Sequence, residues 1–148
     1  MRNHFLKTLT MIGVLVVLSA VSGRAQVGSG FRVTVPFDFI VSDKTLPAGE
    51  YIVTRSTQGS ADQLRIQSRD SLDGAYVTTI PVLAGDIQQQ TKAVFRRYDD
   101  QYFLSQVWVS GRATGRQVLK PKRQRSLERN LARRSVKDEA IAVVGTRN

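Results

Sequence analysis

Carboxylate and aromatic side chains gather in the stretch VFRRYDDQYFLSQVWVSG, residues 94–111. Its adjacent aspartates, Asp99 and Asp100, belong to a residue type that binds metal ions or forms acid/base pairs. Glycoside hydrolysis requires two carboxylates at a set separation across a cleft, whereas adjacent residues of a strand or turn point apart. We therefore interpret Asp99 and Asp100 as solvated residues of a turn.

A second acidic group consists of Asp70 and Asp73, and Gly74 follows it directly. A calcium loop would need alternating oxygen ligands and a terminal glutamate, and this stretch has neither. The spacing therefore predicts a plain turn rather than a metal site.

Imidazole and thiol chemistry is almost missing from the chain. It has no cysteine, and its single histidine, His4, falls within the N-terminal segment that we interpret as a signal peptide. Without these residues there is no Ser-His-Asp or Cys-His nucleophile system, no ordinary zinc site and no disulfide. We expect a protein that is not an enzyme and that uses no cofactor or metal.

The N-terminus has the order of regions that is typical of a secretory signal peptide. Basic residues precede an almost wholly apolar run over 9–20, and small residues follow it. We predict cleavage after Ala25, a short leader over 26–30 and a single domain over 31–148. The alternative is an uncleaved anchor, although the run is short for a membrane span of ~20 residues. The mature protein would be periplasmic, outer-envelope-associated or secreted, without a transmembrane span.

Charge is distributed unevenly along the chain. Residues 26–111 carry eight basic and nine acidic side chains, whereas residues 112–148 carry eleven basic and three acidic ones. Leu127 and Leu131 have helical spacing within this basic ending. One reading is contact with an anionic partner; the other is a helix packed on the body with its charged face in solvent. The candidate contact residues are Arg112, Arg116, Lys120, Lys122, Arg123, Arg125, Arg129, Arg133 and Arg134.

The stretch 94–111 itself predicts a β-hairpin. With Asp99-Asp100 as its central residues, Arg97 opposes Tyr102; a longer loop is the alternative, because two-residue loops favour Asn-Gly or Asp-Gly. An exposed Arg97–Tyr102 pair would form a cation–π contact. In this register Tyr98 opposes Gln101, Phe95 opposes Leu104, and one face carries Ala93, Phe95, Tyr102, Leu104 and Trp108.

The aromatic residues of the hairpin have two readings. Large aromatic side chains are mostly buried, so we expect Trp108 in the core. The alternative is an aromatic platform for a ligand, formed by Tyr98, Tyr102 and Trp108.

Alternating apolar residues predict that the rest of the domain is mainly β. The stretch FRVTVPFDFIV, residues 31–41, keeps a period of two, and Pro36 places this strand at an edge or a bulge. Together the segments indicate an antiparallel meander of six to seven strands, a small barrel or sandwich, with one C-terminal basic helix. The other expected strands are 50–56, 63–68, 75–83, 93–98, 101–109 and 140–144, and the helix spans 123–135.

Several motifs resemble a family of uncharacterised small exported proteins of acidobacteria-like bacteria. They are VPFDF at 35–39, TLPAGEY at 45–51, VFRRYDDQYFLSQVW at 94–108 and the basic ending at 115–132. The resemblance implies export and a similar fold, but it assigns no role to any residue. Similar proteins commonly have glycine where this chain has Asp99, which bears on the type of turn.

These observations predict a non-enzymatic cell-envelope or secreted protein that acts by binding or by structural association. Its basic ending would contact anionic envelope lipid or polysaccharide; nucleic acid is not expected, because an exported protein rarely meets it. The alternative is a lipocalin-like small-ligand carrier with an internal apolar cavity. A barrel filled by Phe37, Phe39, Leu104 and Trp108 would leave no such room. The oligomeric state stays open.

Overall fold

Ten strands and one helix are formed by residues 30–56, 62–133 and 139–147, the parts of the chain that a computed structural model describes. The expected signal peptide, its cleavage site and Arg134 lie outside these ranges. The strands and the helix, α2, have these bounds: β1 Phe31–Val35, β2 Phe39–Val41, β3 Lys44–Leu46, β4 Gly49–Arg55, β5 Gln63–Ser68, β6 Gly74–Leu83, β7 Lys92–Tyr98, β8 Gln101–Trp108, β9 Thr114–Val118, α2 Lys122–Arg133 and β10 Glu139–Arg147.

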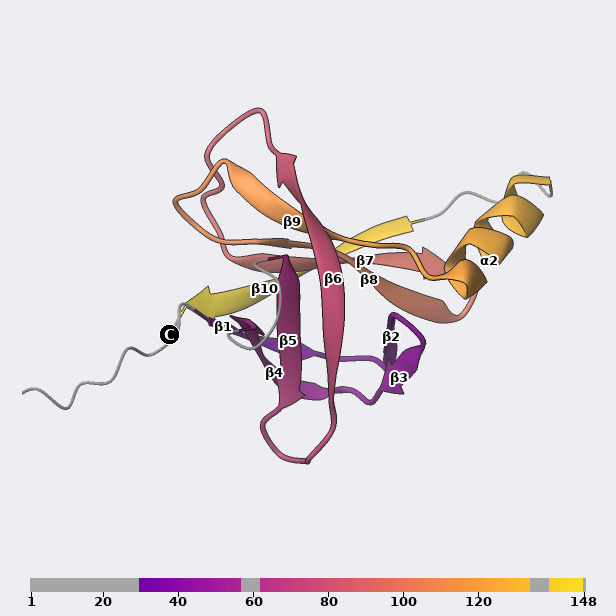
Figure 1. Ribbon diagram of the computed structural model, residues 1–148, viewed down its shortest axis with the longest axis horizontal. Coiled ribbons are helices and arrows are strands. Elements are labelled where there is room, and N and C mark those ends of the chain that lie inside the picture. The colour runs from indigo at the N-terminus through magenta and orange to yellow at the C-terminus, as the bar shows by residue number, and fades with distance from the viewer. Residues whose placement is uncertain (1–29, 57–61, 134–138, 148) are drawn as a thin grey trace, which may run out of the picture.

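Eight of the strands close into an antiparallel barrel, as the mainly β prediction with one late helix anticipates (Figure 1). Their order around the barrel is β8, β7, β10, β1, β4, β5, β6 and β9, and pairing between β8 and β9 closes the ring. The arrangement departs from a simple meander at two places. β9 separates β6 from β8, and β10 separates β7 from β1.

The barrel interior is filled by the side chains that alternation directs inward. On β1 the burial pattern follows a period of two, with Phe31, Val33 and Val35 buried and Thr34 exposed. Aromatic rings then meet edge to face, a favourable geometry: Phe39 lies 5.0 Å from Tyr51 and 5.3 Å from Phe95 between ring centroids. Further buried members of this core are Val41, Leu46, Val53, Leu64, Ile66, Val77, Ala93, Leu104, Val107 and Val118.

The segment expected as one strand over 31–41 is divided into β1 and β2. The break falls at residues 36–38, and Pro36 has no N–H with which to continue a sheet ladder. After it, β2 turns to pair with β3 and meets β8 in parallel at Ile40 and Phe103. Lys44 of β3 donates a hydrogen bond of 3.0 Å to the carbonyl of Gly74 on β6. The β2–β3 hairpin therefore extends from β8 to β6 across one end of the barrel.

The β7–β8 hairpin has the two-residue loop at Asp99-Asp100. Arg97 opposes Tyr102, as expected. Asp99 adopts a φ of 57°, a left-handed conformation that aspartate tolerates better than most residues. The other two predicted pairs, Tyr98 with Gln101 and Phe95 with Leu104, are confirmed as well.

A β-bulge at Ser105 corrects the predicted faces of this hairpin. Leu104 pairs with Phe95 but Gln106 pairs with Val94, so Ser105 is the extra residue. An extra residue exchanges the faces of everything beyond it. Val107 consequently joins the barrel core, whereas Trp108 lies on the outer side with only 7 % of its surface exposed.

Strand β9 was not expected, because its sequence TGRQV holds a single large apolar residue and begins within the basic connection. Trp108 lies across it at Gly115. A Cβ at Gly115 would stand 2.4 Å from Cε3 of the Trp108 ring. Glycine is thus required here so that the indole can pack closely against the strand.

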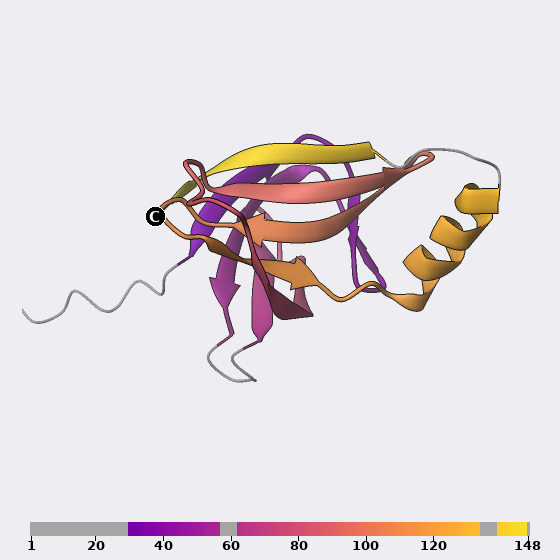
Figure 2. The same ribbon diagram turned by 90° about the horizontal axis from the view of Figure 1, so that it is seen from above.

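Helix α2 projects from the end of the barrel that lies away from the C-terminal end of β10 (Figures 1 and 2). Its Leu127 and Leu131 pack against a small buried cluster on the outer side of the hairpin, formed by Ile40, Tyr98 and Phe103. The β7–β8 hairpin is therefore covered on both faces, by the barrel core and by the helix. This agrees with the apolar residues on both of its parities.

Candidate functional site

The three aromatic residues of the predicted platform lie in separate surroundings. Tyr98, the last residue of β7, is buried beneath α2, whereas Trp108, the last residue of β8, is buried against Gly115. Tyr102 is half-buried and stacks on Phe37, with ring centroids 4.0 Å apart. The structure does not bring the three rings together on one surface. Arg97 does stand over Tyr102, 5.7 Å from its centroid, which confirms the predicted cation–π contact.

The acidic tip of the hairpin is partly neutralised by Arg97. Its guanidinium donates a 2.9 Å hydrogen bond to the backbone carbonyl of Asp99. It also lies 3.9 Å from the carboxylate of Asp100 and 3.8 Å from that of Glu139 on β10. Both aspartates are exposed and make a turn. Among the described residues no group of three or more acidic or histidine side chains is arranged to hold a metal.

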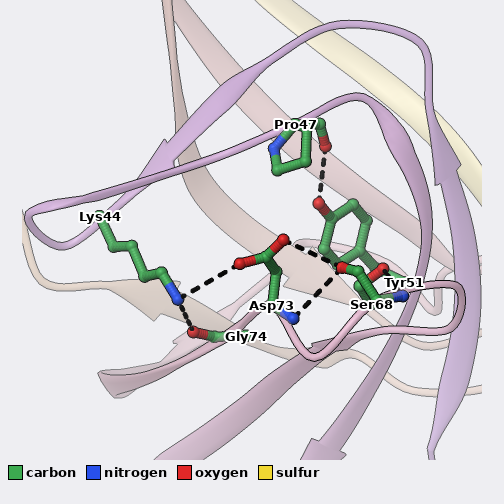
Figure 3. Close-up of polar contacts among 7 residues, drawn as sticks. Lys44, Pro47, Tyr51, Ser68, Asp73 and Gly74 are labelled. Atoms are coloured by element: carbon green, nitrogen blue, oxygen red, sulfur yellow. Dashed lines mark hydrogen bonds and ion pairs between the residues drawn. The ribbon is translucent and has the colours of Figure 1, made fainter.

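The turn between β5 and β6 contains the second acidic group, of which Figure 3 shows Asp73. Ser71 donates a 3.0 Å hydrogen bond to one carboxylate oxygen of Asp73, and Lys44 lies 3.8 Å from the other. Lys44 also donates to Gly74, as described above. The carboxylate of Asp73 thus links the β2–β3 hairpin to this turn, which is a structural role.

Tyr51 lies beside this turn, and its phenol has a raised pKa. Its hydroxyl donates a 2.6 Å hydrogen bond to the carbonyl of Pro47, and the ring is almost fully buried. Burial raises the pKa of the Tyr51 phenol above its ordinary value, and the nearby charges of Asp73 and Asp38 raise it further. The phenol is therefore neutral at physiological pH and does not serve as a base there.

The predicted cationic residues are divided between the two ends of the barrel. Arg112 precedes β9 and Arg116 lies within it, at the end where β10 finishes with Arg147. The others that the structure describes lie on α2 or directly before it, at the opposite end: Lys120, Lys122, Arg123, Arg125, Arg129 and Arg133. One basic segment of the sequence thus supplies two separate groups of cations.

On α2, one face docks and the opposite face carries charge. The inward face contains Gln124, Leu127, Glu128 and Leu131, which recur every three or four residues, the spacing of one helix face. All four are buried or half-buried. A stripe of exposed cations occupies the opposite face, and we call it the helix stripe: Lys122, Arg125, Arg129 and Arg133.

Polar contacts hold the docked face in place. The hydroxyl of Tyr98 donates a hydrogen bond to the carboxylate of Glu128, which also accepts one of 2.6 Å from Lys120. The amide of Gln124 donates to the same hydroxyl at 3.4 Å. Because these bonds and the two leucines fix the inward face, the helix stripe is turned toward solvent.

The other end of the barrel is open and forms a pocket of about 130 Å³. Every barrel strand except β7 contributes to its lining. Its floor is apolar and buried, with Phe31, Val53, Leu64 and Val107. We call its cationic lining the arginine rim: Arg55, Arg112, Arg116 and Arg147.

Two members of the arginine rim, Arg55 and Arg147, were missed in the sequence. They are single cations at the last positions of β4 and β10, far apart in the chain. The available signal is positional: each is a basic residue that ends an alternating apolar strand. Only the antiparallel pairing of both strands with β1 shows that they finish at the same end.

Comparisons of the chain with family models, with curated proteins and with solved structures found no match. The resemblance to small exported proteins therefore stays a prediction. Among the described residues, no helix combines the length and the apolar character that a membrane crossing requires.

Proposed function

We propose that this protein is a non-enzymatic cell-envelope or secreted protein that attaches to anionic surfaces through the helix stripe. The observation that carries the proposal is the division of α2 into a docked face and an opposite cationic face. A helix that only covered the barrel would need the first of these faces. The second is a row of positive charges with no carboxylate of the described residues paired to it.

The attachment would be electrostatic rather than by apolar insertion. Leu127 and Leu131 are the large apolar residues of α2, and both are occupied in docking. A basic side chain close to an anionic membrane surface contributes about 1 kcal/mol, and salt screens this attraction. Loss of three cations of the stripe would therefore weaken attachment by about 100-fold.

Export and the lack of catalysis belong to the same proposal. The N-terminal pattern supports export, and the only histidine, His4, precedes the predicted cleavage site. Of the carboxylates in the two turns, Asp73 is engaged in structural contacts, and Asp70, Asp99 and Asp100 are exposed. A lipocalin-like carrier would use the barrel interior, but Phe39, Tyr51 and Phe95 occupy its centre, so a ligand would have to sit at the open end.

Cosedimentation with lipid vesicles tests the proposal. The mature chain should sediment with phosphatidylcholine vesicles that contain phosphatidylglycerol, not with phosphatidylcholine alone, and should be released as salt rises to about 0.5 M. The triple variant Lys122→Gln, Arg129→Gln, Arg133→Gln should lose this binding. An acidic polysaccharide in place of the vesicles shows whether the partner is lipid or carbohydrate.

A matched control removes the same charge from the opposite end of the barrel. The variant Arg55→Gln, Arg112→Gln, Arg147→Gln has the same net charge but keeps the helix stripe, so it should bind vesicles like the parent. Equal loss in both variants would mean that net charge alone governs binding. Binding that ignores salt or vesicle charge would refute electrostatic attachment.

A further inference from the structure

We infer that the open end of the barrel is a binding site for a small organic anion, a carboxylate or phosphate carried by an apolar group about the size of a benzene ring. This site is separate from attachment through α2, because its lining includes Arg147 at the end of β10, and α2 lies at the opposite end of the molecule (Figures 1 and 2).

The apolar floor and the volume define the size of the ligand. Phe31, Val53, Leu64 and Val107 present buried side chains to the pocket from four different strands. A cavity of ~150 Å³ with such a lining holds benzene, whereas drug-sized ligands need ~300 Å³ or more. The observed 130 Å³ therefore fits a single ring or a short branched chain.

The arginine rim defines the charge of the ligand. Among the described residues that line the pocket, four are arginines and none is acidic. Arg116 is held by Asp62, with 2.7 Å between Nη1 and Oδ1. Arg55, Arg112 and Arg147 form no ion pair with a carboxylate of the described residues. Guanidinium groups match carboxylate and phosphate oxygens with paired hydrogen bonds, so an anion is the ligand that this rim favours.

The loop that carries Arg112 is fastened before any ligand arrives. The backbone carbonyl of Arg112 accepts a 3.0 Å hydrogen bond from the backbone N–H of Gln88, and the N–H of Gly111 donates one of 2.8 Å to the carbonyl of Gln88. The neighbouring Ser110 donates from its backbone to Thr91 and from its hydroxyl to Gln89. A loop held in this way loses little backbone freedom when Arg112 contacts a ligand, which favours affinity.

The test compares four probes by isothermal titration and by the amide NMR shifts of the mature chain. Benzoate and phenyl phosphate carry ring and charge, benzamide carries the ring alone, and inorganic phosphate carries charge alone. We expect saturable binding of the first two, with shifts at Leu64 and Val107, and at least about tenfold weaker binding of the last two. A preference between the first two identifies the anionic group.

Two triple variants complete the test. The rim variant Arg55→Gln, Arg112→Gln, Arg147→Gln should weaken benzoate binding at least about tenfold, and its unfolding midpoint in urea should match that of the parent, because these side chains are at the surface. The stripe variant Lys122→Gln, Arg129→Gln, Arg133→Gln should bind benzoate normally. The inference is overturned by absent saturation, by equal binding of benzamide, or by a rim variant that binds like the parent.

Discussion

The close packing of Trp108 on β9 can be tested by adding one methyl group. In Gly115→Ala the new Cβ would lie 2.4 Å from Cε3 and 2.7 Å from Cδ2 of the ring, whereas ordinary contact begins at 3.4 Å. The indole must therefore retreat by about 1 Å. Overpacking of this kind costs about 1–3 kcal/mol of unfolding free energy. The retreat would also disturb the 3.2 Å hydrogen bond from Nε1 to Gln106.

The sequence contains a single tryptophan, so fluorescence reports on this contact directly. Urea unfolding of Gly115→Ala should show the lower stability, and the emission of Trp108 should move to longer wavelength as the ring gains solvent. Gly85→Ala is the matched control, because its Cβ would meet nothing within 4 Å. Adding Trp108→Phe to Gly115→Ala should recover part of the lost unfolding free energy, because the smaller phenyl ring leaves room for the alanine methyl group. Parental stability and unchanged emission in Gly115→Ala would refute the packing argument.

Three further predictions concern the turn, the buried phenol and the helix contact. Asp99→Gly should raise the unfolding free energy by about 0.5–1 kcal/mol, because glycine adopts positive φ without strain; an unchanged or lower urea midpoint would contradict this. The pKa of Tyr51 is raised in the folded protein, so the unfolded chain releases the phenol proton at lower pH than the folded one. The stabilisation that Tyr51 provides is therefore fully present below pH 10.0 and is lost as the pH rises from there through the folded-state pKa. The urea concentration at the unfolding midpoint should decrease as the pH rises through that window, and this decrease should be smaller in Tyr51→Phe. Tyr98→Phe should speed amide hydrogen exchange in α2 about tenfold by removing a hydrogen bond to a carboxylate, whereas Tyr102→Phe, whose hydroxyl makes no hydrogen bond with the described residues, should not.

The strands could be predicted from alternating apolar and polar residues where one face is buried and the other is exposed to solvent. Alternation over 31–41 predicted a strand there, of which 31–35 form β1, and the spacing of Leu127 and Leu131 identified the docked side of α2. β9 was not predictable in this way, because Val118 is its only large apolar residue. That strand exists because β6 and β8 each present an edge to it, a long-range effect that no local pattern carries.

The candidate site was predictable only in part, for related reasons. The residues of the helix stripe could be predicted from the basic ending, because a high density of basic residues can be read directly from the sequence. The arginine rim also needs Arg55 and Arg147, which become neighbours of Arg112 through barrel closure. Similarly, the bulge at Ser105 has no sequence signal here, and it alone placed Trp108 on the face opposite to the expected one.

The place of β10 in the barrel has a kinetic consequence. This last strand fills the gap between β1 and β7, so it joins the two ends of the described chain. Until it arrives, both neighbours present unpaired edges that other chains can join. Contacts so distant in sequence form slowly, and the partly folded barrel is exposed meanwhile. Changes that delay this final step, such as Gly145→Ala with its Cβ 2.4 Å from a carbonyl of β1, should therefore reduce the yield of folded protein by aggregation.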